Sequence, residues 1–245
     1  MAETLLEAAW MVEAPDISRL ITEDDTPVDN VFSAKQQRLL VEPLYSSWNP
    51  GCPFFADANV GIFGSLREPP IVPDMFLSLD VQPAEDLWAK EHRSYFLWEF
   101  GKPPEVVVEI VSNTRGGEVD KKFRRYARLG IWYYLIFDPQ QLVQKEKLRV
   151  YQLSLGRYVP KEEPFLEQID LGVALWGGVF EGKQALWLRW CDAQGQVIPT
   201  GVERIEQERG IAERERQRAE RLAAQLRALG IEPDHNGGRE YEEHP

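Results

Sequence analysis

Two strand-like apolar runs joined by one short helix, in residues 105–137, constrain this chain more than any other feature. Residues 105–111 (EVVVEIV) are nearly continuous in β-branched side chains, which is typical of a strand buried on both faces. Residues 118–130 (EVDKKFRRYARLG) predict a helix that ends at Gly130, and residues 131–137 (IWYYLIF) predict a second buried strand. This order indicates a right-handed crossover between two parallel strands. The expected fold class is therefore α/β.

The segments before this unit predict a helix and a further strand. Residues 34–48 (AKQQRLLVEPLYSSW) predict a helix that is capped by Ser33 and that Pro43 ends or bends. Asp74 comes directly before residues 75–81 (MFLSLDV), whose alternating side chains predict a strand.

Residues 83–100 are rich in charged and aromatic side chains and predict an insertion that forms a helix or a lid. After the crossover unit, the sequence predicts hairpin strands at residues 147–153, 156–159, 185–192 and 196–199. We expect turns at Leu155–Gly156 and at residues 193–195.

Residues 202–230 predict a long helix that is dominated by Glu, Arg and Ala. Heptad spacing aligns Ile205, Ala212, Ala219 and Leu226 at one seam position, and Glu208, Glu215, Leu222 and Leu229 at the other. Gly210 weakens the middle of this pattern. Two interpretations stay open. In the first, the segment 202–229 forms a coiled coil that pairs two copies of the chain. In the second, it is a single solvated helix that carries Glu–Arg pairs four residues apart.

Composition excludes several classes of protein. Hydrophobic residues make up 43% of the chain and there are eight Trp, which excludes a chain disordered throughout. No apolar run approaches the roughly 18 residues that span a membrane, and the acidic N-terminus lacks the basic region of a secretory signal. Cys52 and Cys191 make neither a disulfide framework nor a zinc-binding pair, so we expect a cytoplasmic protein with no membrane partner.

The net charge of −12 argues against general nucleic-acid binding, which usually needs a basic protein. Basic residues nevertheless gather at 121–128 (KKFRRYAR). Because salt confines charge effects to about 8–10 Å, a local basic surface could offset the acidity of the whole chain.

Glu109 is the first candidate for chemistry, because it is a carboxylate within an apolar strand sequence. A buried carboxylate must be paired, hydrogen-bonded or bound to a metal. The alternative is a residue at a strand edge whose side chain lies in water.

Lys122 is the second candidate, because the helical period separates it from its neighbour Lys121. At about 100° per residue, the buried face of helix 118–130 comprises Phe123, Tyr126 and Ala127. Lys122 lies at the edge of that face beside Tyr126, whereas Lys121 points to the opposite side. Since Glu109 lies near the end of its strand and Lys122 about one turn into the next helix, both belong at one end of the sheet. The alternative is that Lys122 only extends along the apolar edge into solvent.

Asp74 completes a set that suits Mg²⁺, which prefers oxygen ligands and usually takes one or two carboxylates. A metal held in this way activates water and neutralises charge on a phosphodiester, and a nearby lysine orients the water or stabilises the developing charge. The three histidines are scattered, and the chain has neither a P-loop nor a GxSxG motif.

Several motifs of the chain resemble the Uma-two family of restriction endonuclease-like proteins, a branch of the PD-(D/E)XK nuclease superfamily. The motifs are residues 71–81 (IVPDMFLSLDV), 103–113 (PPEVVVEIVSN), 116–118 (GGE) and 120–139 (DKKFRRYARLGIWYYLIFDP). The likeness extends to residues 35–48, to 188–201 and to the C-terminal helix, and it covers roughly residues 33–230. It implies a restriction endonuclease-like α+β fold in which helices flank a mixed β-sheet. The expected parts are an N-terminal flexible arm at 1–31, a nuclease-like domain at 32–201, the helix at 202–230 and a disordered tail at 231–245.

Carried over by motif, the resemblance implies metal ligands at Asp74 and Glu109 and a catalytic lysine at Lys122, four residues before Tyr126. The usual superfamily lysine, two positions after the Glu, is replaced here by Val111, which would offer only its backbone carbonyl to metal or water. Some superfamily members add an acidic residue from the first helix, for which Glu42 is the candidate. Arg124 and Arg125 are candidates for phosphate contact.

The preferred hypothesis is an endonuclease that uses Mg²⁺, or Mn²⁺ in its place, to hydrolyse a phosphodiester, with DNA as the substrate. The second hypothesis is a catalytically silent interaction protein on a nuclease scaffold that acts through its C-terminal helix. A third is a glycoside hydrolase with Asp74 and Glu109 as acid and base, which leaves Lys122 unexplained.

Overall fold

The computed structural model describes residues 30–230 except 67, 84, 87, 89–91 and 113–116, and it describes only the backbone of residues 117–120. The arm expected at 1–31, apart from its last two residues, and the tail expected at 231–245 lie outside the described residues.

The described residues form four helices and eleven strands. The helices are α2 (Val31–Ser47), α3 (Leu97–Phe100), α4 (Gly117–Leu129) and α5 (Gly201–Ala228). The strands are β1 (Phe54–Asp57), β2 (Ile62–Phe63), β3 (Met75–Leu79), β4 (Tyr95–Phe96), β5 (Val106–Ile110), β6 (Tyr133–Phe137), β7 (Leu148–Ser154), β8 (Arg157–Lys161), β9 (Phe165–Leu166), β10 (Leu171–Phe180) and β11 (Lys183–Cys191).

The centre of the molecule is a six-stranded mixed sheet with the order β1-β3-β5-β6-β7-β8. β5 and β6 pair in parallel, as the crossover prediction requires, and α4 connects them. The other neighbours in this sheet are antiparallel. The fold is therefore a mixed α+β architecture, consistent with the restriction endonuclease-like class.

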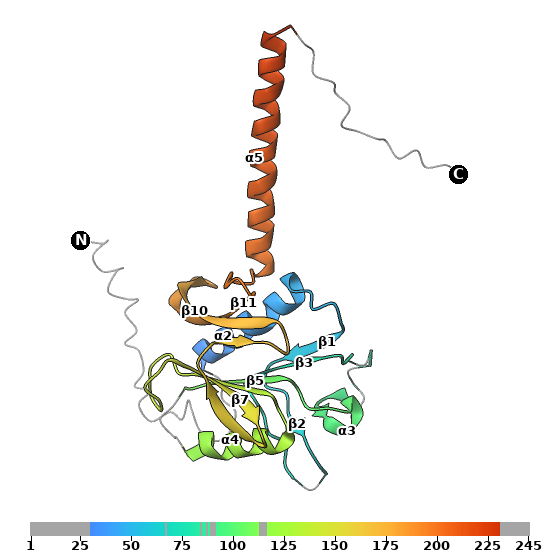
Figure 1. Cartoon of the computed structure of the whole chain (residues 1–245), viewed down its shortest axis with the longest axis vertical. Helices are drawn as coiled ribbons and strands as arrows, with labels where there is room; N and C mark the ends of the chain where they lie inside the picture. The colour runs from blue at the N-terminus through green and yellow to red at the C-terminus, as the bar shows by residue number, and fades with distance from the viewer. Residues whose placement is uncertain are drawn as a thin grey trace, which may run out of the picture.

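Helices cover both faces of this sheet, with α2 on one side and α4 on the other (Figure 1). Successive side chains of β5 point to opposite faces of the sheet and so belong to two different cores. Val106 and Val108 join the core under α2, whereas Val107 joins the core under α4 together with Tyr126. Glu109 lies two residues after Val107 in the same strand, so its side chain also points to the face that α4 covers.

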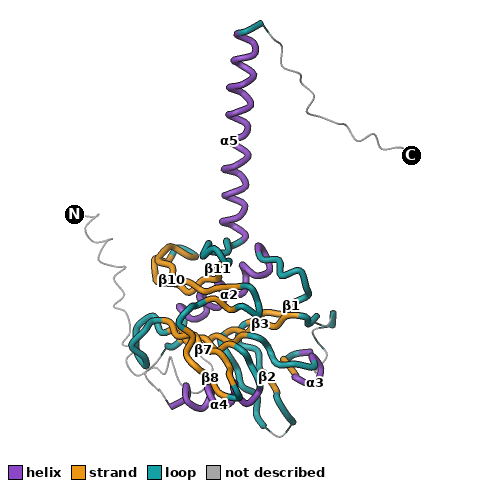
Figure 2. The backbone as a smooth tube through the Cα atoms, in the orientation of Figure 1, coloured by secondary structure: helices purple, strands orange, loops and turns teal. Residues whose placement is uncertain are grey.

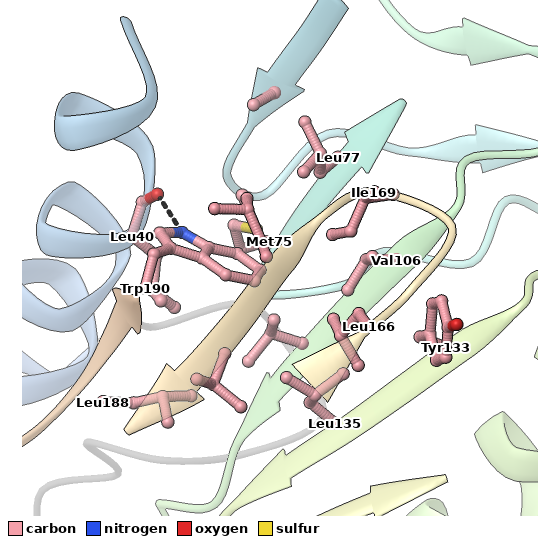
Figure 3. Close-up of a cluster of buried hydrophobic side chains, with 14 of the residues drawn as sticks. Leu40, Met75, Leu77, Val106, Tyr133, Leu135, Leu166, Ile169, Leu188 and Trp190 are labelled. Atoms are coloured by element: carbon pink, nitrogen blue, oxygen red, sulfur yellow. Dashed lines mark hydrogen bonds between the residues drawn. The ribbon is translucent and has the colours of Figure 1, made fainter. Parts of the chain in front are cut away.

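A second sheet, β11-β10-β9, lies beside α2 (Figure 2) and contributes Leu166, Leu188 and Trp190 to the core on the same face of the central sheet. Trp190 lies in the core between this sheet and α2, where its Nε1 donates a hydrogen bond to the Leu40 carbonyl at 2.7 Å (Figure 3). The amide of Gln36 exchanges two hydrogen bonds with the Leu188 backbone, at 2.8 and 2.9 Å. α2 is thus held to β11 by polar as well as apolar contacts.

The start and end of α2 differ from the sequence prediction. Asn30 rather than Ser33 caps the helix, because the Asn30 Oδ1 accepts the Ser33 backbone N–H at 2.9 Å. Pro43 lies inside the helix, which continues to Ser47. The missing N–H removes one helical bond, and the packing of the buried Leu40 and Leu44 side chains supports the helix on both sides of it.

The end of the predicted insertion is part of the body rather than a lid. β4 pairs in parallel with β2. Tyr95 is fully buried, and its hydroxyl lies 2.9 Å from Ser78 Oγ and donates to the Lys102 carbonyl at 3.0 Å. Residues 95–100 are therefore fixed against the sheet.

The β7–β8 hairpin confirms the predicted turn, because Leu155 and Gly156 both have positive φ, at 49° and 76°. The turn predicted at 193–195 also forms, with Gly195 at φ 75°. The sequence analysis missed β10 and its turn at Glu181–Gly182, because β10 contains three glycines that weaken its strand signal.

α5 confirms the long helix expected at 202–230 and projects from the body (Figure 1). Its N-cap is Thr200, whose side chain forms a capping box with Glu203, and the helix continues through Gly210. None of its side chains is buried. Within the described residues, no helix is both long and apolar enough to cross a membrane.

Candidate active site

Strand register brings Asp74 and Glu109 together. β3 and β5 are antiparallel, with Met75 opposite Val108. Continuing that register by one residue places Asp74 opposite Glu109, on the face of the sheet that α4 covers. Directly opposed side chains of antiparallel strands lie about 4.5–5.5 Å apart at Cβ, so the two carboxylates are neighbours.

α4 supplies two partners to Glu109 from adjacent turns. Lys122 Nζ forms an ion pair with Glu109 Oε2 at 2.7 Å, and Tyr126 donates its hydroxyl to Glu109 Oε1 at 2.6 Å. Residues four apart lie on one face of a helix, so this spacing lets one helix contact both oxygens of one carboxylate. Lys122 also donates to the Val72 carbonyl at 3.1 Å, which ties α4 to the segment leading into Asp74.

The two adjacent lysines of α4 have the different environments that the helical period predicts. Lys121 is exposed, whereas the Lys122 side chain is 22% exposed and contacts Glu109. Tyr126 is fully buried, and Phe123 packs against the same core.

Asp74 is held by donors from two other elements. Its Oδ2 accepts the Ile110 backbone N–H at 2.6 Å, and its Oδ1 accepts from Gln37 Nε2 at 3.2 Å. Burial and the negative charge of Glu109 raise the pKa of Asp74 to about 7, although the Ile110 amide and the Lys122 charge oppose this rise. Burial and the same Glu109 carboxylate raise the pKa of Tyr126 far above its ordinary value, so Tyr126 is a neutral hydroxyl donor.

Among the other expected site residues, Val111 directly follows β5 and donates its N–H to the Phe137 carbonyl at 2.8 Å. Glu42 is the candidate whose contacts differ most from the expectation. Its Oε1 accepts the Gly201 N–H at 2.8 Å, at the start of α5. The α2 side chain that reaches Asp74 is Gln37.

The two arginines expected to contact phosphate differ from each other. Arg124 is exposed on α4. Arg125 donates to the carbonyls of Pro69 at 2.5 Å and Pro70 at 3.4 Å, so its guanidinium holds that loop.

Gln37 and Asn59 were missed as site residues by the sequence analysis. Gln37 exchanges hydrogen bonds with Asn59, and both line a surface hollow of about 320 Å³ between α2 and residues 57–59. The signal that could have revealed Gln37 is its position on the buried face of α2, three residues before Leu40. A glutamine on an apolar face needs polar partners.

The donor set fits a divalent metal with oxygen ligands. Asp74 and Glu109 are two neighbouring carboxylates, and each carboxylate oxygen has two acceptor positions, so the bonds already made leave room for a metal. Burial and the negative charge of Glu109 raise the pKa of Asp74, and a bound cation would offset both by favouring the ionised carboxylate. In the part of the chain that is described, no group of three or more Asp, Glu, His or Cys side chains is placed to hold a metal ion together. The remaining positions of a metal would therefore fall to water, carbonyl or substrate oxygens, which Mg²⁺ accepts readily.

The fold and this site define a nuclease-like protein of the restriction endonuclease class, in which a mixed sheet presents an Asp, a Glu and a lysine at one end of a crossover unit. Residues 23–178, more than half of the chain, match the family model Uma2, described as "putative restriction endonuclease". The chain therefore belongs to the Uma2 family. No curated protein matches the chain.

Proposed function

We propose that this protein is a metal-dependent endonuclease that hydrolyses DNA phosphodiester bonds. The observation that carries the proposal is the contact of Lys122 with Glu109 at 2.7 Å, next to the opposed Asp74. The family description supports nuclease function in general.

In this proposal, Asp74 and Glu109 hold Mg²⁺ or Mn²⁺, with the Val111 carbonyl as a further oxygen. The bound metal would lower the pKa of a water molecule and neutralise charge on the phosphate. Lys122 orients the attacking water and stabilises negative charge as it develops. Water adds to phosphorus, a P–O bond to the sugar breaks, and the released oxygen takes up a proton.

The contacts around α4 favour Arg124 over Arg125 as a phosphate contact. Arg124 is exposed beside the exposed Lys121, whereas Arg125 is engaged by the carbonyls of Pro69 and Pro70. Glu42 is likewise engaged at the base of α5, so we do not include it among the metal ligands.

Plasmid cleavage with Mg²⁺ or Mn²⁺, against the same reaction with EDTA, tests the proposal. Asp74→Asn, Glu109→Gln and Lys122→Ala should each lower the cleavage rate at least 100-fold. Lys121→Ala removes the neighbouring exposed lysine and should leave the rate at saturating DNA within about twofold, because Lys121 does not face the carboxylates and surface substitutions away from a site have small effects. A purified wild-type protein that cleaves neither DNA nor RNA with either metal would contradict the proposal.

A second candidate function is partner binding through α5, which extends from the body with half-exposed apolar side chains at Ile205, Ile211 and Leu222. A second copy bound along residues 202–229 would bury these side chains. Ion pairs within the helix, such as Glu213 with Arg216 at 3.0 Å, instead support a single solvated helix. Sedimentation of the full chain against a chain ending at residue 201 separates the two, because only the coiled coil gives a loss of dimer on truncation.

A further inference from the structure

The side-chain amides of Gln37 and Asn59 hydrogen-bond to each other beside Asp74. Gln37 Nε2 donates to both Asn59 Oδ1 and Asp74 Oδ1, at 3.2 Å each, and Asn59 Nδ2 donates back to Gln37 Oε1 at 3.2 Å. Gln37 is only 5% exposed, so these bonds form away from bulk water. Buried amide contacts of this kind are costly to leave unmade.

The Asp74 carboxylate determines which end of the Gln37 amide faces it. An amide has a donor end and an acceptor end that differ little in shape. Because an ionised carboxylate only accepts hydrogen bonds, the Gln37 nitrogen is the end that faces Asp74, and the Gln37 oxygen accepts from Asn59 Nδ2. The opposite orientation would bring an amide oxygen against a carboxylate oxygen.

The backbone at Asn59 has an uncommon conformation. Asn59 has φ 57°, in the left-handed region that most side chains avoid and that asparagine tolerates better than most. Residues held in this region occur often where the surrounding structure requires a particular geometry. From this conformation the Asn59 amide makes its two hydrogen bonds with Gln37 of α2.

We propose that Gln37 and Asn59 are positioning residues that hold the Asp74 carboxylate in the orientation that binds the metal. Asp74 has one oxygen on the Ile110 N–H and the other on the Gln37 amide, so both oxygens are directed while each keeps an acceptor position for a cation. This inference rests on the proposed function, because it assigns the pair to the same metal site.

The test is Mn²⁺ binding to the full-length protein, measured by titration calorimetry without any nucleic acid. Gln37→Met keeps the length of the side chain and removes the donor to Asp74. We expect its Kd for Mn²⁺ to rise about 10-fold or more, since loss of a group that orients a metal ligand typically costs 10–100-fold in affinity.

Gln36→Met is the matched control. Gln36 is the neighbouring residue of α2, is fully buried and also makes two hydrogen bonds through its amide, but to the backbone of Leu188 rather than to Asp74. Gln36→Met should lower the thermal stability while leaving the Kd for Mn²⁺ within about twofold. Equal Mn²⁺ affinity of Gln37→Met and wild type, or equal weakening by both variants, would overturn the positioning role.

Asn59→Gly provides a second route if Gln37→Met does not fold. Glycine adopts the left-handed conformation without strain, so the backbone is retained while the amide partner of Gln37 is lost. We expect a several-fold rise in Kd for Mn²⁺. Leu155→Gly, at another positive-φ position in the β7–β8 turn, is its control and should leave the Kd unchanged. If Asp74→Asn abolishes the Mn²⁺ binding of the wild-type protein but Asn59→Gly has no effect on it, this inference is overturned and the proposed function is not. Wild-type protein that binds no Mn²⁺ overturns both.

Discussion

At the scale of single residues, the candidate site depends on hydrogen-bond partners rather than on the carboxylates alone. Glu109 has a cation on one oxygen and a neutral hydroxyl on the other, both from α4. These two donors fix the rotation of the carboxylate. They also offset part of the cost of placing Glu109 in an apolar strand.

Tyr126→Phe should therefore affect both stability and metal affinity. Removing the hydroxyl leaves one oxygen of a buried carboxylate without this donor, which costs about 1–3 kcal/mol in the free energy of unfolding. We also expect the Kd for Mn²⁺ to rise about 10-fold, because Glu109 loses the bond that orients it. Chemical denaturation and Mn²⁺ calorimetry measure the two effects.

Tyr158→Phe is the matched control for this prediction. Tyr158 lies in the same core as Tyr126 and donates its hydroxyl to the Ile131 carbonyl at 2.8 Å, away from the carboxylates. It should lower stability and leave Mn²⁺ affinity unchanged. A Tyr126→Phe variant that loses stability alone, like Tyr158→Phe, would argue against an orienting role for the Tyr126 hydroxyl.

At the scale of elements, α2 links the site to the base of α5. Gln37 contacts Asp74, Gln36 contacts β11, and Glu42 accepts the first N–H of α5. α5 is also fixed by Arg189 of β11, whose guanidinium is buried and donates to both oxygens of Glu203, at 2.5 and 2.8 Å. The start of α5 is thus part of the folded body.

The Arg189–Glu203 pair predicts a pH-dependent contribution to stability. Burial opposes ionisation of Glu203, but the hydrogen bonds from Arg189 and Thr200 outweigh it and lower the pKa of Glu203 below its ordinary value of 4.5. A lowered folded-state pKa means that this stabilisation is fully present above about pH 4.5 and is lost as the pH falls through the lower folded-state pKa.

Glu203→Gln retains the length and the capping box but removes the charge. Its melting temperature should be below that of wild type at pH 7, and the difference should shrink as the pH falls below about 4. Thermal unfolding of both proteins from pH 7 to pH 3 gives this comparison. A difference that stays constant over that range would show that the charge of Glu203 contributes nothing.

At the scale of the whole molecule, the projecting part of α5 is structurally separate from the nuclease-like body. The hydrogen bonds described between α5 and the body lie in its first turn, and the side chains from Ile211 to Glu220 are all exposed. Glu–Arg pairs along the helix support it without the body.

A chain that ends at residue 210 should therefore keep the fold and the site. We expect its melting temperature to lie within about 2 °C of the full-length protein, since changes away from packed contacts usually cost under about 0.5 kcal/mol. Its Kd for Mn²⁺ should be unchanged. A large loss of stability on this truncation would indicate that residues 211–230 bind the body or a second copy in solution.

The sequence by itself determined the local elements and the chemistry of one helix. Apolar runs and Gly130 predicted the β5–α4–β6 unit, and the helical period distinguished Lys122 from Lys121, because both signals depend only on neighbouring residues. Asp74 and Glu109 were proposed as partners from the chemistry of a metal site and from resemblance, whereas their direct opposition follows from the β3–β5 register, which joins segments more than 30 residues apart.

Only the tertiary structure decided the contacts that span the chain. Gln37 meets Asp74, Arg125 holds residues 69–70, and Glu42 holds the start of α5 because separate elements pack together. A glutamine or an arginine carries the same donors in any sequence. Packing determines which acceptor lies within reach, so these roles could not be predicted from local pattern.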